Sequence, residues 1–296
     1  MNMHLLKTKQ FAVIIICMFL SNLSLAESAS KTISDKVSEE VGETNAPSYR
    51  DTIAESSVTY IGNEGILFSN GEQKALFDPF FHNVYGQYQA VPKEIQTAIF
   101  ANTPPYDDID IIVVSHSHGD HFTAETVADY LSKYSNTVLV APSQATDQVL
   151  EHSPKLIEQI RSLELDFGDA VITTEVEGIE IQSVRIPHAG WPERADIANL
   201  VHRVSLGNGT TIIHMGDADP LDEHFAPFAE HWDEKNSDAA FPPYWFFLSD
   251  EGPTILSERI NAKDAVGIHV PVAVPLELKD SGAEYFSNPG STKALR

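Results

Sequence analysis

The chain has 296 residues, with 43 acidic against 19 basic side chains and a formal net charge of −24 at pH 7. A surface with this excess of negative charge repels nucleic acid and anionic lipid, so neither is expected as a partner. The only cysteine is Cys17, which lies in the N-terminal segment described next. Disulfides and thiolate ligands are therefore not expected in the folded protein, and any metal must be held by nitrogen and oxygen.

Residues 1–26 have the composition of an export signal. Two lysines precede an apolar run from Phe11 to Leu20, and the small-residue segment Ser24–Ala26 follows as a cleavage site. The apolar run is about half of the roughly 20 residues that a membrane-spanning helix needs, so cleavage is favoured over retention as an anchor. The mature protein would then begin at Glu27, carry a formal charge of −26 and be periplasmic or secreted, with no stable membrane anchor.

Residues 27–56 are polar, poor in aromatic side chains and without periodicity, which is typical of a flexible leader. The remaining segment, residues 57–296, has a length within the range of one large α/β domain. It contains no apparent linker or tandem repeat. We expect a single folded domain there.

The pattern of apolar residues predicts strands and helices in both halves of this domain. Strands are expected at 58–61, 66–68, 74–77, 109–114, 137–140, 170–175, 179–186, 200–206 and 211–215, with further apolar segments at 239–241 and 265–268. Helices are expected at 93–101, 124–134, 145–151, 154–163, 221–231 and 254–261. Two sheets packed face to face with helices outside account for this order better than a doubly wound parallel sheet, which needs regular alternation.

Four potential metal ligands occur within six residues at the end of the predicted strand 109–114. They are His116, His118, Asp120 and His121. Imidazole and carboxylate are the ligand types that suit zinc and its first-row neighbours. The alternative is a polar loop that happens to be rich in histidine, and it is the less favoured interpretation because so many ligand types rarely cluster by chance.

The pattern His-x-His-x-Asp-His resembles the signature of the metallo-β-lactamase superfamily. Three further ligand types stand at the ends of predicted strands in the order that the resemblance implies, namely His188, Asp217 and His269. It implies that His116, His118 and His188 hold a first metal, that Asp120, His121 and His269 hold a second, and that Asp217 bridges both. It also implies a four-layer αββα sandwich over residues 57–296, and a supporting role for Asp78.

Within the superfamily, Tyr60-Ile61-Gly62, Gly65-Ile66-Leu67 and Leu76-Phe77-Asp78-Pro79 resemble the lactonase-like branch. That branch also holds phospholipases that act on N-acyl phosphatidylethanolamines. A β-lactamase is the alternative within the fold, and the lactonase-like opening argues against it.

The implied function is an exported hydrolase that cleaves an ester, lactone or phosphodiester bond of a small-molecule substrate. Two metal ions about 3.5 to 4 Å apart would share a hydroxide. Asp120 would orient this hydroxide and Asp217 would hold the metals together. Zinc is favoured, while manganese and iron suit the same ligands. An iron-dependent oxidoreductase and a non-catalytic metal-binding protein remain alternatives, and the oligomeric state is open.

Several other polar residues have simpler interpretations. We expect His214 to be a core histidine, Asp219 to cap the next helix, and His224 and His231 to lie on the surface. Arg194 and Arg203 either bind a substrate anion or are solvated, the second being the default. The aromatic loops 80–89, 190–192 and 238–245 either line a pocket or pack the end of the sandwich.

Overall fold

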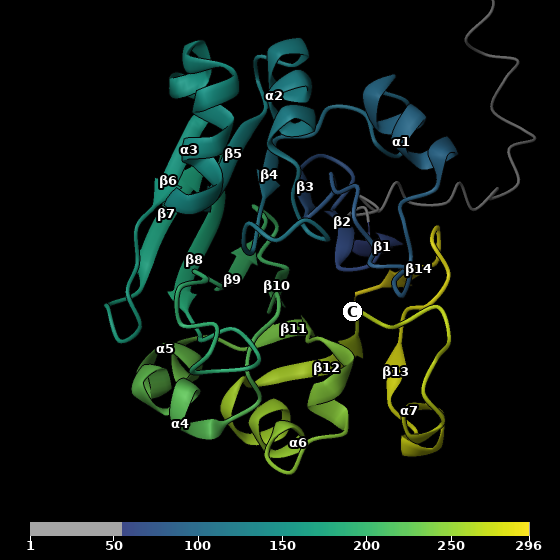
Figure 1. Cartoon of the computed structure of the whole chain (residues 1–296), viewed down its shortest axis with the longest axis vertical. Helices are drawn as coiled ribbons and strands as arrows, with labels where there is room; N and C mark the ends of the chain where they lie inside the picture. Colours follow the sequence, from purple (N-terminus) through teal and green to yellow (C-terminus); the bar gives the residue numbers. More distant parts are fainter. Residues whose placement is uncertain (1–54, 296) are drawn as a thin grey trace, which may run out of the picture. The chain divides into compact units, whose positions relative to one another are not determined.

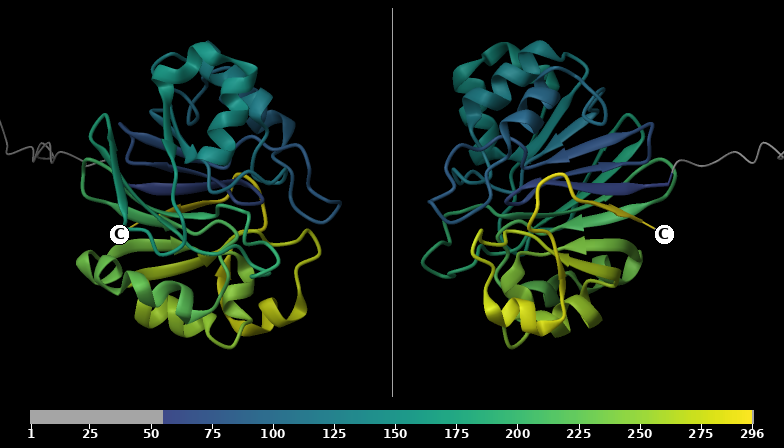
Figure 2. Two further views of the ribbon diagram at one scale, coloured as in Figure 1. Left: turned by 60° about the vertical axis from the view of Figure 1, so that its left-hand side comes forward. Right: turned by 90° about the vertical axis from the view of Figure 1, so that its right-hand side faces the viewer.

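Two seven-stranded sheets form the centre of the fold over residues 55–295, the part of the chain that this computed structural model describes (Figures 1 and 2). The predicted export signal and the leader up to residue 54 lie outside the described residues. Within residues 55–295, none of the helices combines the length and apolarity that crossing a bilayer requires.

The first sheet has the strand order β14-β1-β2-β3-β4-β5-β6. Its strands are β1 (Ser57–Gly62), β2 (Gly65–Ser69), β3 (Lys74–Phe77), β4 (Ile111–Val113), β5 (Val138–Pro142), β6 (Ile160–Leu163) and β14 (Thr292–Ala294). β1 to β3 form an antiparallel meander, as the turn residues predicted, and β3 to β6 are parallel. The C-terminal strand β14 pairs with β1 and so closes this edge of the domain.

The second sheet has the order β13-β12-β11-β10-β9-β8-β7. Its strands are β7 (Ile172–Val176), β8 (Ile179–Arg185), β9 (Leu200–Ser205), β10 (Thr211–His214), β11 (Ser237–Phe241), β12 (Ala262–Gly267) and β13 (Glu284–Tyr285). β7 to β10 are antiparallel and β10 to β13 are parallel. In each sheet, the carboxyl ends of the parallel strands lie along one edge.

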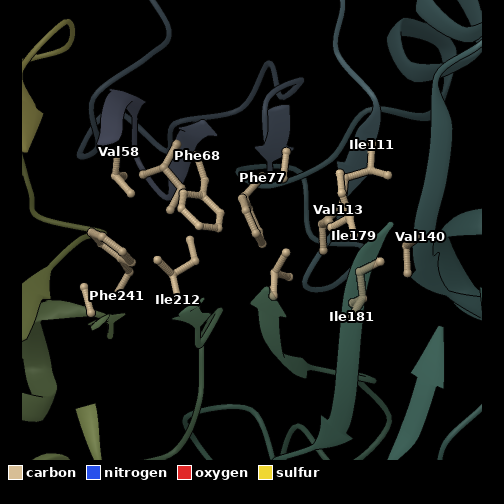
Figure 3. Close-up of a cluster of buried hydrophobic side chains, with 14 of the residues drawn as sticks. Val58, Phe68, Phe77, Ile111, Val113, Val140, Ile179, Ile181, Ile212 and Phe241 are labelled. Carbon is tan, nitrogen blue, oxygen red and sulfur yellow. The ribbon is translucent and has the colours of Figure 1, made fainter. Parts of the chain in front are cut away.

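The main core lies between the sheets, where Phe68 and Phe77 of the first face Ile212 and Phe241 of the second (Figure 3). Successive side chains of a strand point to opposite faces. In β4 the central residue Ile112 therefore points to the outer face, while its neighbours point inward. Central strands such as β4 and β5 are covered on both faces, and this explains why they are continuous apolar runs.

Helices cover the outer faces of both sheets (Figure 2). The first sheet is covered by α1 (Lys93–Phe100), α2 (Ala124–Lys133) and α3 (Ser143–His152). The second carries α4 (Asp222–Phe225), η2 (Ala226–Phe228), α5 (Ala229–Glu234), η3 (Tyr244–Phe247), α6 (Gly252–Thr254) and the π-helical η4 (Ile255–Arg259), and α7 (Leu276–Ser281) follows. The predicted αββα sandwich is confirmed.

Three predicted helices were wrong in form. Residues 154–163 split into the 3₁₀ helix η1 (Pro154–Gln159) and the strand β6, which pairs in parallel with β5. Hydrogen bonding to the edge of β5 stabilises residues 160–163 as a strand, although their apolar spacing is helical. The predicted helix 221–231 breaks at η2, where Pro227 has no amide hydrogen to donate. The predicted helix 254–261 begins earlier, at Gly252, and its main part is a π-helix.

Candidate metal centre

The seven predicted ligands lie together at the edge where the parallel strands end. The loop from His116 to His121 follows β4, His188 follows β8, Asp217 follows β10, and His269 follows β12. Single bridges continue the strand pairing into these loops, since His188 pairs with Ala218 and Ile268 pairs with Pro243. The two sheets thus bring together side chains that are up to 153 positions apart in sequence.

Three histidines and one oxygen of Asp217 form the first ligand group. His118 Nδ1 lies 3.1 Å from the Nε2 atoms of both His116 and His188. Asp217 Oδ2 lies 3.2 Å from His188 Nε2 and 3.9 Å from His116 Nε2. The four atoms converge on one point, as the implied first metal site requires.

The second group forms around the other oxygen of the same carboxylate. Asp217 Oδ1 lies 3.2 Å from His269 Nε2 and 3.4 Å from His121 Nε2. Asp120 Oδ2 lies 3.3 Å from His269 Nε2 and 3.7 Å from His121 Nε2. Asp217 therefore directs one carboxylate oxygen to each group.

Both groups have the spacing of a metal site, and the second group also has buried ligand atoms without hydrogen-bond partners. Two ligands that are each about 2.0 to 2.1 Å from a tetrahedral zinc lie about 3.3 Å apart. His121 Nε2, His269 Nε2 and Asp217 Oδ1 are buried and have no hydrogen-bond partner in the described structure. Buried polar atoms without partners are costly, and a cation between them removes that cost. The residues therefore fit a pair of metal ions.

Hydrogen bonds orient the imidazoles so that their lone pairs face the site. His121 donates through Nδ1 to Asp78 Oδ2 at 2.9 Å, and His188 donates through Nδ1 to the Ala189 carbonyl at 2.7 Å. Ser115 donates its hydroxyl to Asp78 at 2.6 Å and accepts from His116 Nδ1 at 3.0 Å. In each of these three rings Nδ1 is engaged in a hydrogen bond, and Nε2 is the nitrogen that faces the site. Asp78 lies where the resemblance implied, and Ser115 was missed.

Electrostatic neighbours govern the protonation of this cluster in the absence of metal. Burial acts to raise the pKa of Asp217, but His269 and His121 hold that pKa well below its ordinary value. Burial lowers the pKa of His116 well below its usual range, and His121 acts in the same direction. Asp217 is thus ionised and His116 neutral, which are the forms that coordinate a cation.

Asn199 is a second residue that sequence reasoning missed. It is fully buried, accepts a hydrogen bond from the Asp217 amide at 2.9 Å, and donates to the carbonyls of Ile186 and Met215, each at 3.3 Å. One side chain thus joins the ends of β8 and β10. Gly216 must be glycine beside it, because its φ is +53° and a Cβ there would lie 2.4 Å from Asn199 Oδ1. An asparagine before a strand carries no signal of this role in the sequence.

The turn between β1 and β2 is also part of the site, although we expected only a tight hairpin. Asn63 and Glu64 are fully buried. Asn63 donates to the Asp120 carbonyl at 2.9 Å and accepts from the His269 amide at 3.0 Å, so it connects two ligand loops. Glu64 lies 3.8 Å from both His121 and His214, its carboxyl oxygens have no hydrogen-bond partner, and burial raises its pKa.

A pocket of about 430 Å³ opens onto the ligands. Its lining comprises Tyr85, Tyr88, His118, Asp120, Arg194, Asp196, Ile197, Asp217 and His269. Tyr88 packs edge-on against His269 at a centroid distance of 4.1 Å. The predicted loop 80–89 therefore does line the pocket. Trp245 of the predicted loop 238–245 packs against His269 at 5.2 Å, whereas Trp191 contacts Phe167 and His224.

Other polar residues differ from their predicted positions. Asp219 does not cap α4, because the residue at the N-cap position is Leu221. Instead, Asp219 Oδ1 lies 3.5 Å from His224 Nδ1. His224 and His231 are buried, not on the surface: His224 lies against Phe167, Trp191 and Asp219, and His231 contacts Arg203 of β9. Arg203 is buried and bonds Gln182, Glu234 and the end of α5, so it is unavailable to substrate.

His214 is a core histidine, as predicted. It is fully buried, stacks on Phe77 at a centroid distance of 5.0 Å, and places its Nε2 3.0 Å from the Glu64 carbonyl. It does not reach either ligand group.

Comparison with known proteins places these features in a family. The curated relatives include metal-dependent hydrolases of the UPF0173 group. That of Pyrococcus abyssi is 28% identical over 160 residues, 54% of this chain and 60% of the relative, and that of Bacillus cereus is 26% identical over 199 residues, 64% of this chain and 80% of the relative. The chain thus spans about three fifths of the length of the Pyrococcus relative.

Solved structures show the same fold at low identity. The metallo-β-lactamase fold protein YhfI of Bacillus subtilis has a TM-score of 0.54 and 16% identity, and covers 81% of this chain and 99% of its own. The metallo hydrolase Igni18 of Ignicoccus hospitalis has a TM-score of 0.55 and 12% identity, and covers 81% and 98%. The family profile described as a beta-lactamase superfamily domain matches residues 57–233, more than half of the chain. The protein belongs to the β-lactamase superfamily.

Proposed function

We propose that this protein is a dinuclear metal-dependent hydrolase. The observation that carries the proposal is the position of Asp217, whose two oxygens face two separate ligand groups 3.2 to 3.9 Å away. A carboxylate so placed would hold two cations, one through each oxygen. The relatives that carry the name metal-dependent hydrolase support the same reaction class.

The residues divide into those that hold metal and those that meet the substrate. His116, His118 and His188 would hold one ion, and Asp120, His121 and His269 the other, with Asp217 between them. Such ions, with zinc as the first expectation, supply an activated water and polarise the electrophilic oxygen of the substrate. No serine or cysteine nucleophile is then needed.

Asp120 has a second task in this scheme. It lines the pocket as well as the second ligand group, so it is placed to accept a hydrogen bond from the attacking water and to orient it. Asp217 remains ionised beside His121 and His269, and its two oxygens would connect the two ligand groups. His121 and His116 keep their orientation through the hydrogen bonds that end on Asp78.

The bond that is cleaved is an ester, a lactone or a phosphodiester in this proposal, following the resemblance of the opening strands to the lactonase-like branch. The pocket volume of about 430 Å³ suits a small molecule. The export signal makes the periplasm or the extracellular medium the proposed location.

Elemental analysis of the purified protein tests the proposal. We expect about two zinc or manganese ions per chain in the wild type, one in His269→Ala, and none held tightly in Asp217→Ala. His152→Ala is a matched control, because His152 is exposed at the end of α3. Iron with oxygen consumption would favour an oxidoreductase, and absence of metal would favour a non-catalytic protein.

A further inference from the structure

One arginine at the pocket has no partner. Residues 55–295 contain five arginines, and four of them form hydrogen bonds or ion pairs: Arg161 with backbone carbonyls, Arg185 with Asp166, Arg203 with Glu234, and Arg259 with Asp222. The side chain of Arg194 makes no hydrogen bond or ion pair with any residue in 55–295, although its backbone carbonyl accepts from the Ile197 amide at 3.1 Å. Arg161 also lacks a carboxylate partner, but its guanidinium donates to backbone carbonyls, whereas the guanidinium of Arg194 has no acceptor within 55–295.

The unpaired side chain of Arg194 lies at the pocket that opens onto the candidate metal ligands. It lines the pocket together with Asp120, Asp217 and His269, and it is the only lysine or arginine in that lining. Asp196 lines the same pocket but does not come within ion-pair distance of Arg194. The guanidinium is therefore available to a molecule that enters the pocket.

The backbone that carries Arg194 is held on both sides. Arg185 donates to the Ala195 carbonyl at 2.9 Å, and Gln144 donates to the Asp196 carbonyl at 2.6 Å. The side chain runs over Gly190, where a Cβ would lie 3.5 Å from Arg194 Cδ. The loop therefore has little freedom, and binding through Arg194 would not require ordering it first.

The chemistry of a free guanidinium selects an oxyanion. Its planar fork donates two parallel hydrogen bonds to a carboxylate or a phosphate, which a neutral substrate cannot accept with the same strength. The strongly negative protein repels anions in general, so a substrate anion needs a local cation to bind. Tyr85, Tyr88 and Ile197 supply apolar surface in the same pocket.

We propose that Arg194 binds an oxyanion group of the substrate, a carboxylate or a phosphate, while the bond to be cleaved lies at the ligand groups around Asp217. This inference rests on the proposed hydrolase function. It narrows the substrate class from esters, lactones and phosphodiesters in general to those that carry a negatively charged group apart from the bond to be cleaved.

Direct binding tests this separately from catalysis. Succinate, inorganic phosphate and the neutral succinamide are titrated calorimetrically into the metal-loaded wild type, Arg194→Gln and Arg161→Gln, the last replacing an exposed arginine on β6. We expect about 10-fold weaker binding of the favoured anion in Arg194→Gln and no change in Arg161→Gln. A preference for succinate or for phosphate identifies the group. Anion binding that persists unchanged in Arg194→Gln occurs at the metals and overturns the proposal, as does absence of anion binding in the wild type.

Two nitrophenyl esters then test the role in turnover. Mono-4-nitrophenyl succinate carries a free carboxylate and 4-nitrophenyl butyrate does not. We expect Arg194→Gln to raise KM about 10-fold for the first and less than about 2-fold for the second, with Arg194→Lys in between because it keeps the charge and loses the fork. Asp196→Asn is a control for the pocket lining, and it should not raise the KM for the anionic ester. Equal losses for both esters would show that Arg194 only shapes the pocket. If the wild type hydrolyses neither ester, that result counts against the hydrolase proposal, and the calorimetry still decides the role of Arg194.

Discussion

Replacing Asn199 by alanine should destabilise the metal-free protein, because Asn199 supports the backbone on either side of the candidate metal site. The change removes the partner of the Asp217 amide at 2.9 Å and two longer bonds, at 3.3 Å, to the carbonyls of Ile186 and Met215. The site is fully buried, so the amide loses its only hydrogen-bond acceptor in the described structure. A buried donor without a partner costs about 1 to 3 kcal/mol, and the two longer bonds add about 1 kcal/mol, for a total of about 2 to 4 kcal/mol.

The assay is a thermal melt in excess chelator, because metal binding would add stability that depends on metal concentration. For a domain of this size, 1 kcal/mol corresponds to about 2 to 4 °C, so the midpoint should fall by about 10 °C. Asn136→Ala, at an exposed position before β5, is the control and should melt with the wild type. Zinc affinity should also fall in Asn199→Ala, since Asp217 and the loop before His188 lose a shared support.

A difference below about 1 °C between Asn199→Ala and the wild type would refute this reasoning. It would mean that water or a backbone shift satisfies the Asp217 amide as well as the asparagine does. Normal stability with reduced zinc affinity would instead confine the role of Asn199 to positioning Asp217.

Three further predictions concern Gly216, His202 and the N-terminal segment. Gly216→Ala should lower both stability and zinc content, because the new Cβ would meet Asn199 Oδ1 at 2.4 Å and φ is +53°; metal content equal to the wild type would contradict this. Burial lowers the pKa of His202 to about 4, below the unfolded value of 6.5. The stability gained by keeping this imidazole neutral is therefore complete above pH 6.5, and it is lost as the pH falls toward 4. Between pH 7.5 and 5 the metal-free wild type should lose about 2 kcal/mol more than His202→Gln in denaturant titrations, and parallel pH profiles would exclude this role. The secreted protein should begin at Glu27 by N-terminal sequencing, and an intact Met1 would argue for a retained segment.

Much of the fold was readable from local pattern. The meander β1 to β3 followed from apolar runs separated by Asn-Glu-Gly and Asn-Gly turns, and the structure has these strands within one or two residues of the prediction. The strands β4 and β5 are apolar on both faces, which is the signature of a sheet covered on both sides. Residues 160–163 were misassigned because Leu156, Ile160 and Leu163 have helical spacing, whereas pairing with the edge of β5 makes this segment a strand.

The candidate ligands could be named from the sequence because each stands shortly after a predicted strand, and the structure brings the seven side chains together. The motif from His116 to His121 is local, and the order of His188, Asp217 and His269 matches a superfamily pattern. What surrounds them was not readable. Ser115, Asn199 and the turn at Asn63 and Glu64 act through hydrogen bonds that cross between loops, and no spacing in the chain signals such bonds.

The sequence by itself determined the ligand types, their order and the strand ends that carry them, since these depend on side-chain chemistry and on the period of apolar residues. Only the tertiary structure decided which polar residues face the site. It buried His224, His231 and Arg203, which the sequence left on the surface, and it left Arg194 without a partner at the pocket. The physical reason is that burial and pairing depend on neighbours from distant strands, and local periodicity contains no record of those neighbours.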